Sequence, residues 1–192
     1  MTRLRRALAR FRRDESASVT VETLIMVPIM CWLFIASFVM FDAFNVQSRN
    51  IKAGYTIGDI LSRETGYITT AYINGLNDLQ GVLLRSDSSR ALQITIYSWD
   101  QSARRYRVRW SRATGGLSPL TDTTLANYAS RLPEMPTGEV AILVRSRVGY
   151  TPLMDVGVPA FTFDEINVTR PRFAPQICWN TSTTAPASTA TC

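Results

Sequence analysis

The sequence contains no histidine, and Lys52 is its only lysine. Without histidine, the chain cannot build a Ser-His-Asp or Cys-His catalytic group or a histidine-ligated metal site. The three cysteines, Cys31, Cys178 and Cys192, match no metal-binding spacing. The sequence also lacks a phosphate-binding loop and a nucleophile elbow. We therefore expect no enzymatic activity, no cofactor and no bound metal.

The basic residues of the chain are concentrated at one end. Its 192 residues suit one domain plus an anchor, and its net charge is +6. Residues 1–17 hold six arginines against Asp14 and Glu15, whereas residues 18–44 carry only Glu22 and Asp42 as charged residues. The charge therefore forms a basic leader next to an apolar segment.

This apolar segment is long enough to cross a membrane. Thr23–Phe41 contains 19 residues without a charge. A helix rising about 1.5 Å per residue covers most of a ~30 Å hydrocarbon core over that length, and only a helix satisfies the backbone there. Pro28 is expected to kink this helix or to remove one of its hydrogen bonds. We predict a transmembrane helix over residues 18–44.

The arginines predict the orientation of this helix. Positively charged flanks remain in the cytoplasm, so the N-terminus is expected to be cytoplasmic and the C-terminal domain extracytoplasmic. A cleaved secretory signal peptide is the alternative. Its apolar region is usually shorter, about 7–15 residues, and ends at a small-x-small site that residues 38–42 do not provide. A retained anchor is therefore the favoured interpretation.

Glu22 stands at the cytoplasmic entrance of the apolar segment and has two interpretations. It could lie at the membrane interface, with its carboxylate in water. If Ser18–Val21 join the helix, however, the carboxylate enters the bilayer, where a charge costs on the order of a few kcal/mol and usually marks function.

Residues 16–30, SASVTVETLIMVPIM, resemble the N-terminus of type IV prepilins and pseudopilins. The Val21-Glu22 pair and Pro28, six positions after the glutamate, are similar to the TadE-like family of minor pseudopilins of tight-adherence (Flp, type IVb) pilus systems. Tyr150-Thr151-Pro152-Leu153 after a valine-rich segment is similar to the same family. The family usually has glycine before its processing site, where this chain has Ala17.

The resemblance implies a mechanism of processing and assembly. A prepilin peptidase would cut between Ala17 and Ser18, which removes all six arginines and exposes a new ammonium group. Glu22 would then pair with the N-terminal amine of a neighbouring pilin and set the axial register of packed helices. The implied partners are other pilins and pseudopilins, the prepilin peptidase, the inner-membrane pilus platform and the lipid bilayer. The implied location is the bacterial inner membrane, with the domain in the periplasm and possible entry into the pilus.

The remainder of the chain predicts a small α+β domain over residues 45–179. Apolar residues continue at helical spacing to about Arg63, and a second helix is expected from Thr69 or Thr70 to Leu84. Three alternating segments predict strands over 91–99, 104–110 and 139–150, and a fourth strand is expected over 161–168. A short helix is expected over 123–131, before Pro133. A helix packed on an antiparallel sheet gives a pilin-like fold.

The C-terminal segment NTSTTAPASTATC, residues 180–192, is too polar to build a core. We predict a flexible tail unless Cys192 tethers it. In an oxidising compartment Cys178 and Cys192 are candidates for a disulfide, with two free thiols as the alternative.

Two charged clusters have ordinary explanations. Arg105, Arg107 and Arg109 alternate with Tyr106, Val108 and Trp110, so one strand face is basic and the other apolar. Because the domain is expected outside the cytoplasm, we predict no nucleic-acid partner. The acidic residues Asp155, Asp164 and Glu165 lack the spaced oxygen ligands of a calcium loop.

Three hypotheses for function follow. The first is a minor pseudopilin that takes part in assembly of a tight-adherence pilus, and so in adhesion, surface colonisation and biofilm formation. The second is a single-pass anchored extracytoplasmic binding or sensor domain whose helix stays in the bilayer. The third is an anchored hydrolase, which requires carboxylates that converge in a pocket.

Overall fold

A computed structural model describes residues 2–11, 17–85 and 88–192 of the chain. It divides into two compact units. The first unit consists of Met1–Asp42 together with Pro152–Val158, and the second consists of Ala43–Thr151 together with Pro159–Cys192. Helix α2 (Ala17–Ser62) contributes its first part to one unit and its second part to the other.

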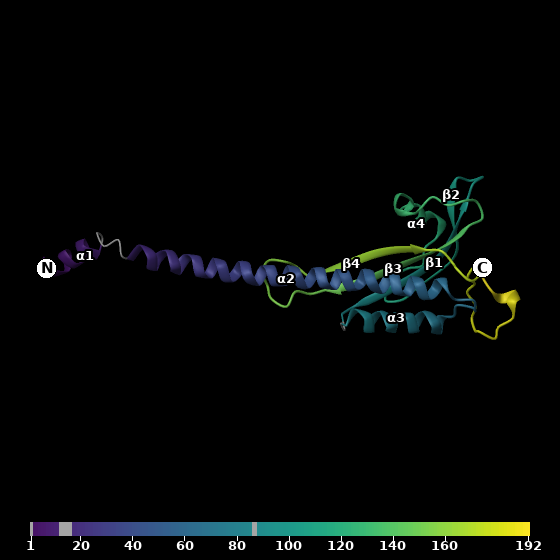
Figure 1. Cartoon of the computed structure of the whole chain (residues 1–192), viewed down its shortest axis with the longest axis horizontal. Helices are drawn as coiled ribbons and strands as arrows, with labels where there is room; N and C mark the ends of the chain where they lie inside the picture. The colour runs from purple at the N-terminus through teal and green to yellow at the C-terminus, as the bar shows by residue number, and fades with distance from the viewer. Residues whose placement is uncertain (1, 12–16, 86–87) are drawn as a thin grey trace. The chain divides into compact units, whose positions relative to one another are not determined.

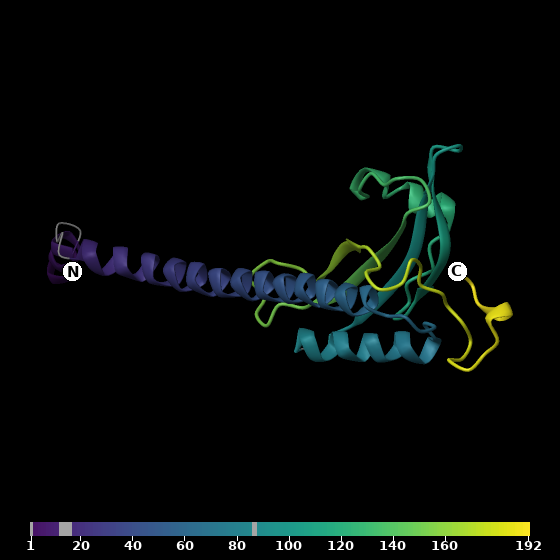
Figure 2. The same cartoon turned by 45° about the vertical axis from the view of Figure 1, so that its right-hand side comes forward.

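The first unit contains α1 (Thr2–Phe11), residues 17–42 of α2 and the loop 152–158. The loop lies beside α2 in both views (Figures 1 and 2). Along α2 the described side chains are exposed up to Phe34; burial begins at Ile35 and Ala36, and Val39 is only 2% exposed. The burial therefore places the loop against the last turns of this part of α2.

In the second unit, α3 (Thr70–Leu84) has clear signals at both ends. The Thr69 hydroxyl accepts a hydrogen bond from the Tyr72 amide, which caps the first turn. Arg85 ends the helix in the left-handed conformation, with φ 52°. Ile73 and Leu76 lie on the buried face. The helix predicted from Thr69 or Thr70 to Leu84 is confirmed.

The four strands form one antiparallel sheet in the order β2-β1-β3-β4. Their bounds are β1 Arg90–Asp100, β2 Arg105–Ala113, β3 Val140–Tyr150 and β4 Phe161–Thr169. The short helix predicted over 123–131 is divided into α4 (Asp122–Ala126) and a 3₁₀ turn at Ala129–Arg131. The α+β class and the four-stranded antiparallel sheet are as the sequence predicted.

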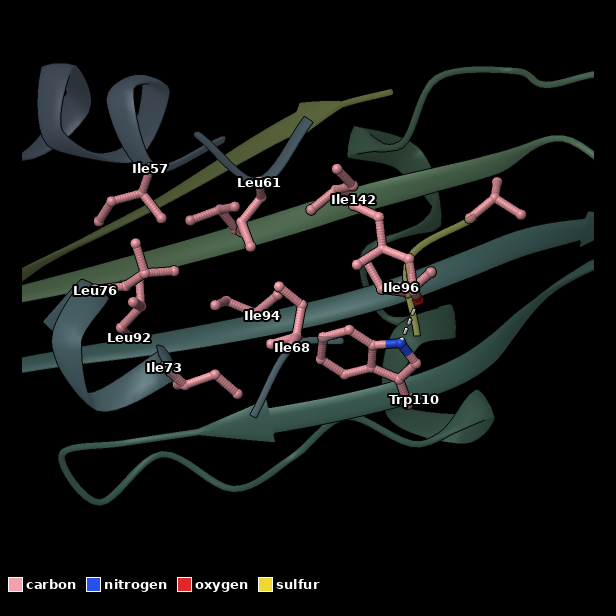
Figure 3. Packing of buried hydrophobic residues seen from close by; sticks show 13 residues of the cluster. Ile57, Leu61, Ile68, Ile73, Leu76, Leu92, Ile94, Ile96, Trp110 and Ile142 are labelled. Carbon is pink, nitrogen blue, oxygen red and sulfur yellow. Dashed lines mark hydrogen bonds between the residues drawn. The ribbon is translucent and has the colours of Figure 1, made fainter. Parts of the chain in front are cut away.

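The sheet buries both faces, each against different elements. On one face a large cluster joins α2, α3 and the strands, as Figure 3 shows; its members include Ile57, Leu61, Ile73, Leu92, Ile94, Trp110 and Ile142. On the other face Tyr97, Ala141 and Leu143 pack with Leu125 of α4 and Leu132. Two faces covered by helices and loops explain why residues 91–98 of β1 are buried without alternation.

A β-bulge in β2 overturns one part of the sequence prediction. Tyr106, Val108 and Trp110 were predicted to share a face, but Trp110 lies opposite Ile96 and Val108 lies opposite Tyr97. Arg109 is therefore the extra residue of the bulge, which moves Trp110 to the other face of the sheet. Trp110 thereby reaches the main core, where its indole N–H donates to the Ile177 carbonyl at 2.7 Å (Figure 3).

Within the second unit, α2 comes very close to β3 and β4. Gly54 and Gly58 face the strands: a Cβ at Gly58 would lie 3.0 Å from the Asn167 side-chain nitrogen. Asn167 donates to the Gly54 carbonyl at 3.2 Å, and Asn50 donates to the Ser146 carbonyl at 3.1 Å. The glycines that weaken the helical pattern in the sequence thus permit helix-to-sheet contact.

Candidate functional site in the apolar helix

The most distinctive feature of the first unit is the uncovered apolar surface of α2. Leu24 and Phe34 are each 76% exposed, and exposed apolar side chains surround the helix from Val19 to Phe34. A helix that is apolar all round belongs in lipid or among other helices. Of the described residues, Val19–Ser62 is the one helix long and apolar enough to cross a membrane. We therefore describe α2 as a candidate membrane anchor.

Glu22 lies in the second turn of α2, within this apolar surface, and its side chain is exposed in the single chain. The next residue, Thr23, donates its hydroxyl to the Val19 carbonyl at 2.8 Å, so it satisfies itself within the helix. The carboxylate of Glu22, by contrast, projects away from the helix. It is therefore available to a group on another molecule.

Pro28 lies inside α2, and the helix continues through it. Proline has no amide hydrogen, so the Leu24 carbonyl loses its usual partner four residues on. Glu22 and Pro28 are six residues apart, which is about 9 Å along the axis and about 120°, or a third of a turn, around it. The two residues are therefore brought onto one helix but not onto one face.

The processing site predicted at Ala17 and Ser18 coincides with the start of α2. Residues 12–16 of the predicted leader, with two of its arginines, lie outside the described residues. The arginines at 3, 5, 6 and 10 belong to α1. The cut between Ala17 and Ser18 stays a prediction.

At the other end of the chain, the sulfur atoms of Cys178 and Cys192 form a disulfide. The Trp179 amide donates to the Thr191 carbonyl at 2.8 Å, and the Thr191 amide returns a bond of the same length. The Ile68 amide donates to the Cys178 carbonyl, which ties the segment to the turn before α3. Residues 180–192, predicted as flexible unless tethered, form a closed loop in the structure.

Removal of this disulfide is expected to lower the free energy of unfolding by about 2–3 kcal/mol, because the bridge joins cysteines 14 residues apart and so restricts the unfolded chain. The measurement is denaturant unfolding of the full chain in detergent micelles, comparing wild type with Cys192→Ser. Cys31→Ala is the matched control because Cys31 is a free thiol on α2. Equal midpoints for all three proteins would contradict a structural role for the bridge.

Two of the arginines of β2 are held by internal partners. Arg107 pairs with Asp100 at 3.0 Å and with Asp122 at 3.7 Å. Arg109 donates to the Ser98 hydroxyl at 3.1 Å. This pairing holds Arg107 and Arg109 against the hairpin and α4, and the absence of a nucleic-acid partner stays a prediction.

Asp164 on β4 forms ion pairs with Arg145 and Arg147, which the β3–β4 register places next to it. It accepts from Arg145 at 2.7 Å and from Arg147 at 2.7 Å, on the face of the sheet opposite α2. Burial raises the pKa of Asp164, but the hydrogen bonds and charges of Arg145 and Arg147 outweigh that effect and hold the pKa below its ordinary value. Among the described residues, no acidic, histidine or cysteine cluster suits a metal ion.

Because the folded-state pKa of Asp164 is depressed, its contribution to stability is present above the unfolded value of about 3.9 and is lost as the pH falls through the folded value. Asp164→Asn should therefore cost about 1–2 kcal/mol of unfolding free energy at neutral pH and progressively less below about pH 4. Asp78→Asn, at an exposed pair with Arg90, should stay within about 0.5 kcal/mol. A pH-independent difference between wild type and Asp164→Asn would contradict this account.

A cleft of about 960 Å³ lies beside the start of β2, between Tyr106, Trp99, α4 and Met135. Its acidic members are Asp122 and Glu134. Asp122 is engaged elsewhere, since it accepts from the Val108 amide at 2.8 Å and pairs with Arg107. Asp122 therefore stabilises the β1–β2 hairpin through its contacts with β2.

Comparison of the chain with protein-family models, with curated proteins and with solved structures finds no match.

The sequence analysis had found Glu22, Pro28 and the cysteine pair. It had missed the Asp164 network, which two arginines two positions apart on one strand could have signalled, and the close approach at Gly54 and Gly58.

Proposed function

We propose that this chain is a minor pseudopilin of the TadE-like type, which takes part in assembly of a tight-adherence pilus. The observation that carries the proposal is a single acidic residue, Glu22, on the exposed apolar surface of α2, directly after an arginine-rich segment. An anchor alone needs apolar residues. It does not need a carboxylate among them, because that charge is costly in lipid unless it finds a partner.

In this proposal the leader is removed between Ala17 and Ser18 by a prepilin peptidase at the inner membrane. The new ammonium of one subunit then meets the Glu22 carboxylate of its neighbour, and the apolar surface of α2 exchanges lipid for other helices. The domain formed by residues 43–151 and 159–192 is in the periplasm and contacts other pilins. The proposal is supported by an apolar helix that continues into a segment packed on an antiparallel sheet, as expected for a pilin-like fold.

A helix-swap experiment separates this function from that of an anchored binding or sensor domain. In the chimera, residues 19–41 are replaced by an unrelated transmembrane segment of equal length, with the rest of the chain intact. The pseudopilin proposal predicts normal membrane insertion but loss of piliation. An anchored domain predicts full function, and retention of pili in the chimera would overturn the proposal. The matched control is the chain with its native segment, and the control and the chimera carry the same epitope tag.

A further inference from the structure

The loop 152–158 exposes apolar side chains that its own unit does not cover. Leu153 is 78% exposed and Met154 is 47% exposed, and the two are adjacent in sequence. Scattered apolar residues are ordinary on a protein surface. This pair differs because it belongs to the same compact unit as the exposed apolar part of α2.

The height of the loop along α2 follows from the burial pattern. The loop shares its unit with α2 only as far as Asp42, and the side chains of α2 are exposed up to Phe34, so we infer that the loop lies beside residues 35–42. A span of about 30 Å needs about 20 residues, so a bilayer entered at Val19 is left near Val39 and one entered at Thr23 is left near Ala43. In either placement Val39 lies between the outer edge of the hydrocarbon and about 6 Å inside it.

We propose that residues 152–158 form a membrane-contact loop, in which Leu153 and Met154 insert into the outer-leaflet boundary between headgroups and acyl chains. The inference rests on the bilayer-spanning role of α2 in the proposed function and deepens it. It gives the extracytoplasmic side of the chain a second contact with lipid, which the helix would have to release when it leaves the bilayer.

The chemistry of the loop sets how deep it inserts. Asp155 is exposed and accepts a hydrogen bond from the Gly157 amide at 3.1 Å, in a turn where Gly157 has φ +88°. A carboxylate avoids hydrocarbon, so Asp155 remains among the headgroups while the two preceding side chains point into the acyl boundary. Irregular backbone that faces lipid is tolerated among the headgroups but not within the hydrocarbon.

Lipid is the molecule most suited to cover Leu153 and Met154, because the loop lies next to the apolar surface of α2. The loop lies against the same helix whose apolar surface needs lipid, so the bilayer that covers α2 reaches the loop without a further partner. Apolar side chains at an interface contribute in proportion to the area they bury.

The test places a single environment-sensitive fluorophore on the full chain in phosphatidylcholine–phosphatidylglycerol nanodiscs. In a Cys31→Ala background, probes are attached at Leu153→Cys, Phe34→Cys and Val82→Cys, with the disulfide left intact. Phe34 lies in the apolar part of α2, and Val82, 72% exposed on α3, matches Leu153 in exposure but belongs to the other unit. Quenching is measured with nitroxide lipids labelled near the headgroup or near the acyl-chain end.

We expect the Leu153 probe to be quenched by the shallow nitroxide several times more strongly than the Val82 probe, and the Phe34 probe to be quenched best by the deep nitroxide. Strong quenching at Phe34 with none at Leu153 overturns the loop contact and leaves the spanning helix intact, with the loop free for a protein partner. Absence of quenching at both Phe34 and Leu153 overturns the spanning helix itself. Adding Met154→Asp to the Leu153 probe should reduce its quenching and leave that of Phe34 unchanged.

Discussion

Replacement of Glu22 with alanine is expected to abolish pilus assembly while membrane insertion stays normal. In the proposed filament the carboxylate faces an ammonium in a low-dielectric helix bundle. Loss of one partner of such a buried pair costs about 3–5 kcal/mol, because it leaves an uncompensated charge. At about 1.4 kcal/mol per tenfold, this is more than a hundredfold loss in the assembly equilibrium.

The measurement is the number of surface pili per cell, together with the amount of chain in the membrane fraction. Thr23→Ala is the matched control, because the Thr23 hydroxyl donates to the Val19 carbonyl of its own helix. Glu22→Asp should retain part of the piliation, since it keeps the charge on a shorter side chain. Wild-type piliation in Glu22→Ala cells would remove the register role of the carboxylate.

The second large effect concerns the close approach of α2 to the sheet. Gly58→Leu is expected to destabilise the domain by about 2–3 kcal/mol or more, because side-chain volume is forced into a packed site. A Cβ there already lies 3.0 Å from the Asn167 amide and 3.4 Å from the Thr169 methyl group. Displacement of Asn167 would also break its bond to the Gly54 carbonyl.

Gly75→Leu is the matched control for this substitution. Gly75 is also a helical glycine, but a Cβ there meets nothing within 4 Å. Leucine has the higher helix propensity, so this change should stabilise α3 by up to about 1 kcal/mol. Both are measured by denaturant unfolding of the full chain in micelles, followed by tryptophan fluorescence. The same shift for both variants would mean that Gly58 is not a packing contact.

Periodicity in the sequence predicted most of the helices and strands. The apolar run at 23–41 and the 3–4 spacing of Ile73, Leu76 and Leu79 have no competing strand interpretation, so helices α2 and α3 could be placed within a residue or two. Alternation placed β1 and β3 within a residue of their ends, whereas β2 continues three residues beyond its predicted end. These signals are local, because each depends on side chains a few positions apart.

The features that the sequence analysis missed depend on contacts between distant segments. The β-bulge at Arg109 reverses the alternation of β2, and β2 contains no glycine from which the bulge could have been predicted. The salt-bridge network of Asp164 depends on the β3–β4 register, and the close contact at Gly58 depends on residues 167 and 169. In the candidate site, the apolar helix and Glu22 could be predicted from neighbouring residues alone. The grouping of the loop 152–158 with α2 joins segments far apart in the sequence, so only the structure could reveal it.

The measurement that tests the central claim most directly is the intact mass of the membrane-extracted chain, from cells with and without a prepilin peptidase. The account predicts a mature form that begins at Ser18 in the first cells and the full chain from Met1 in the second. Trimming makes the ammonium that Glu22 is proposed to meet. A chain that keeps Met1 in both cells would contradict the account and leave an ordinary tethered domain.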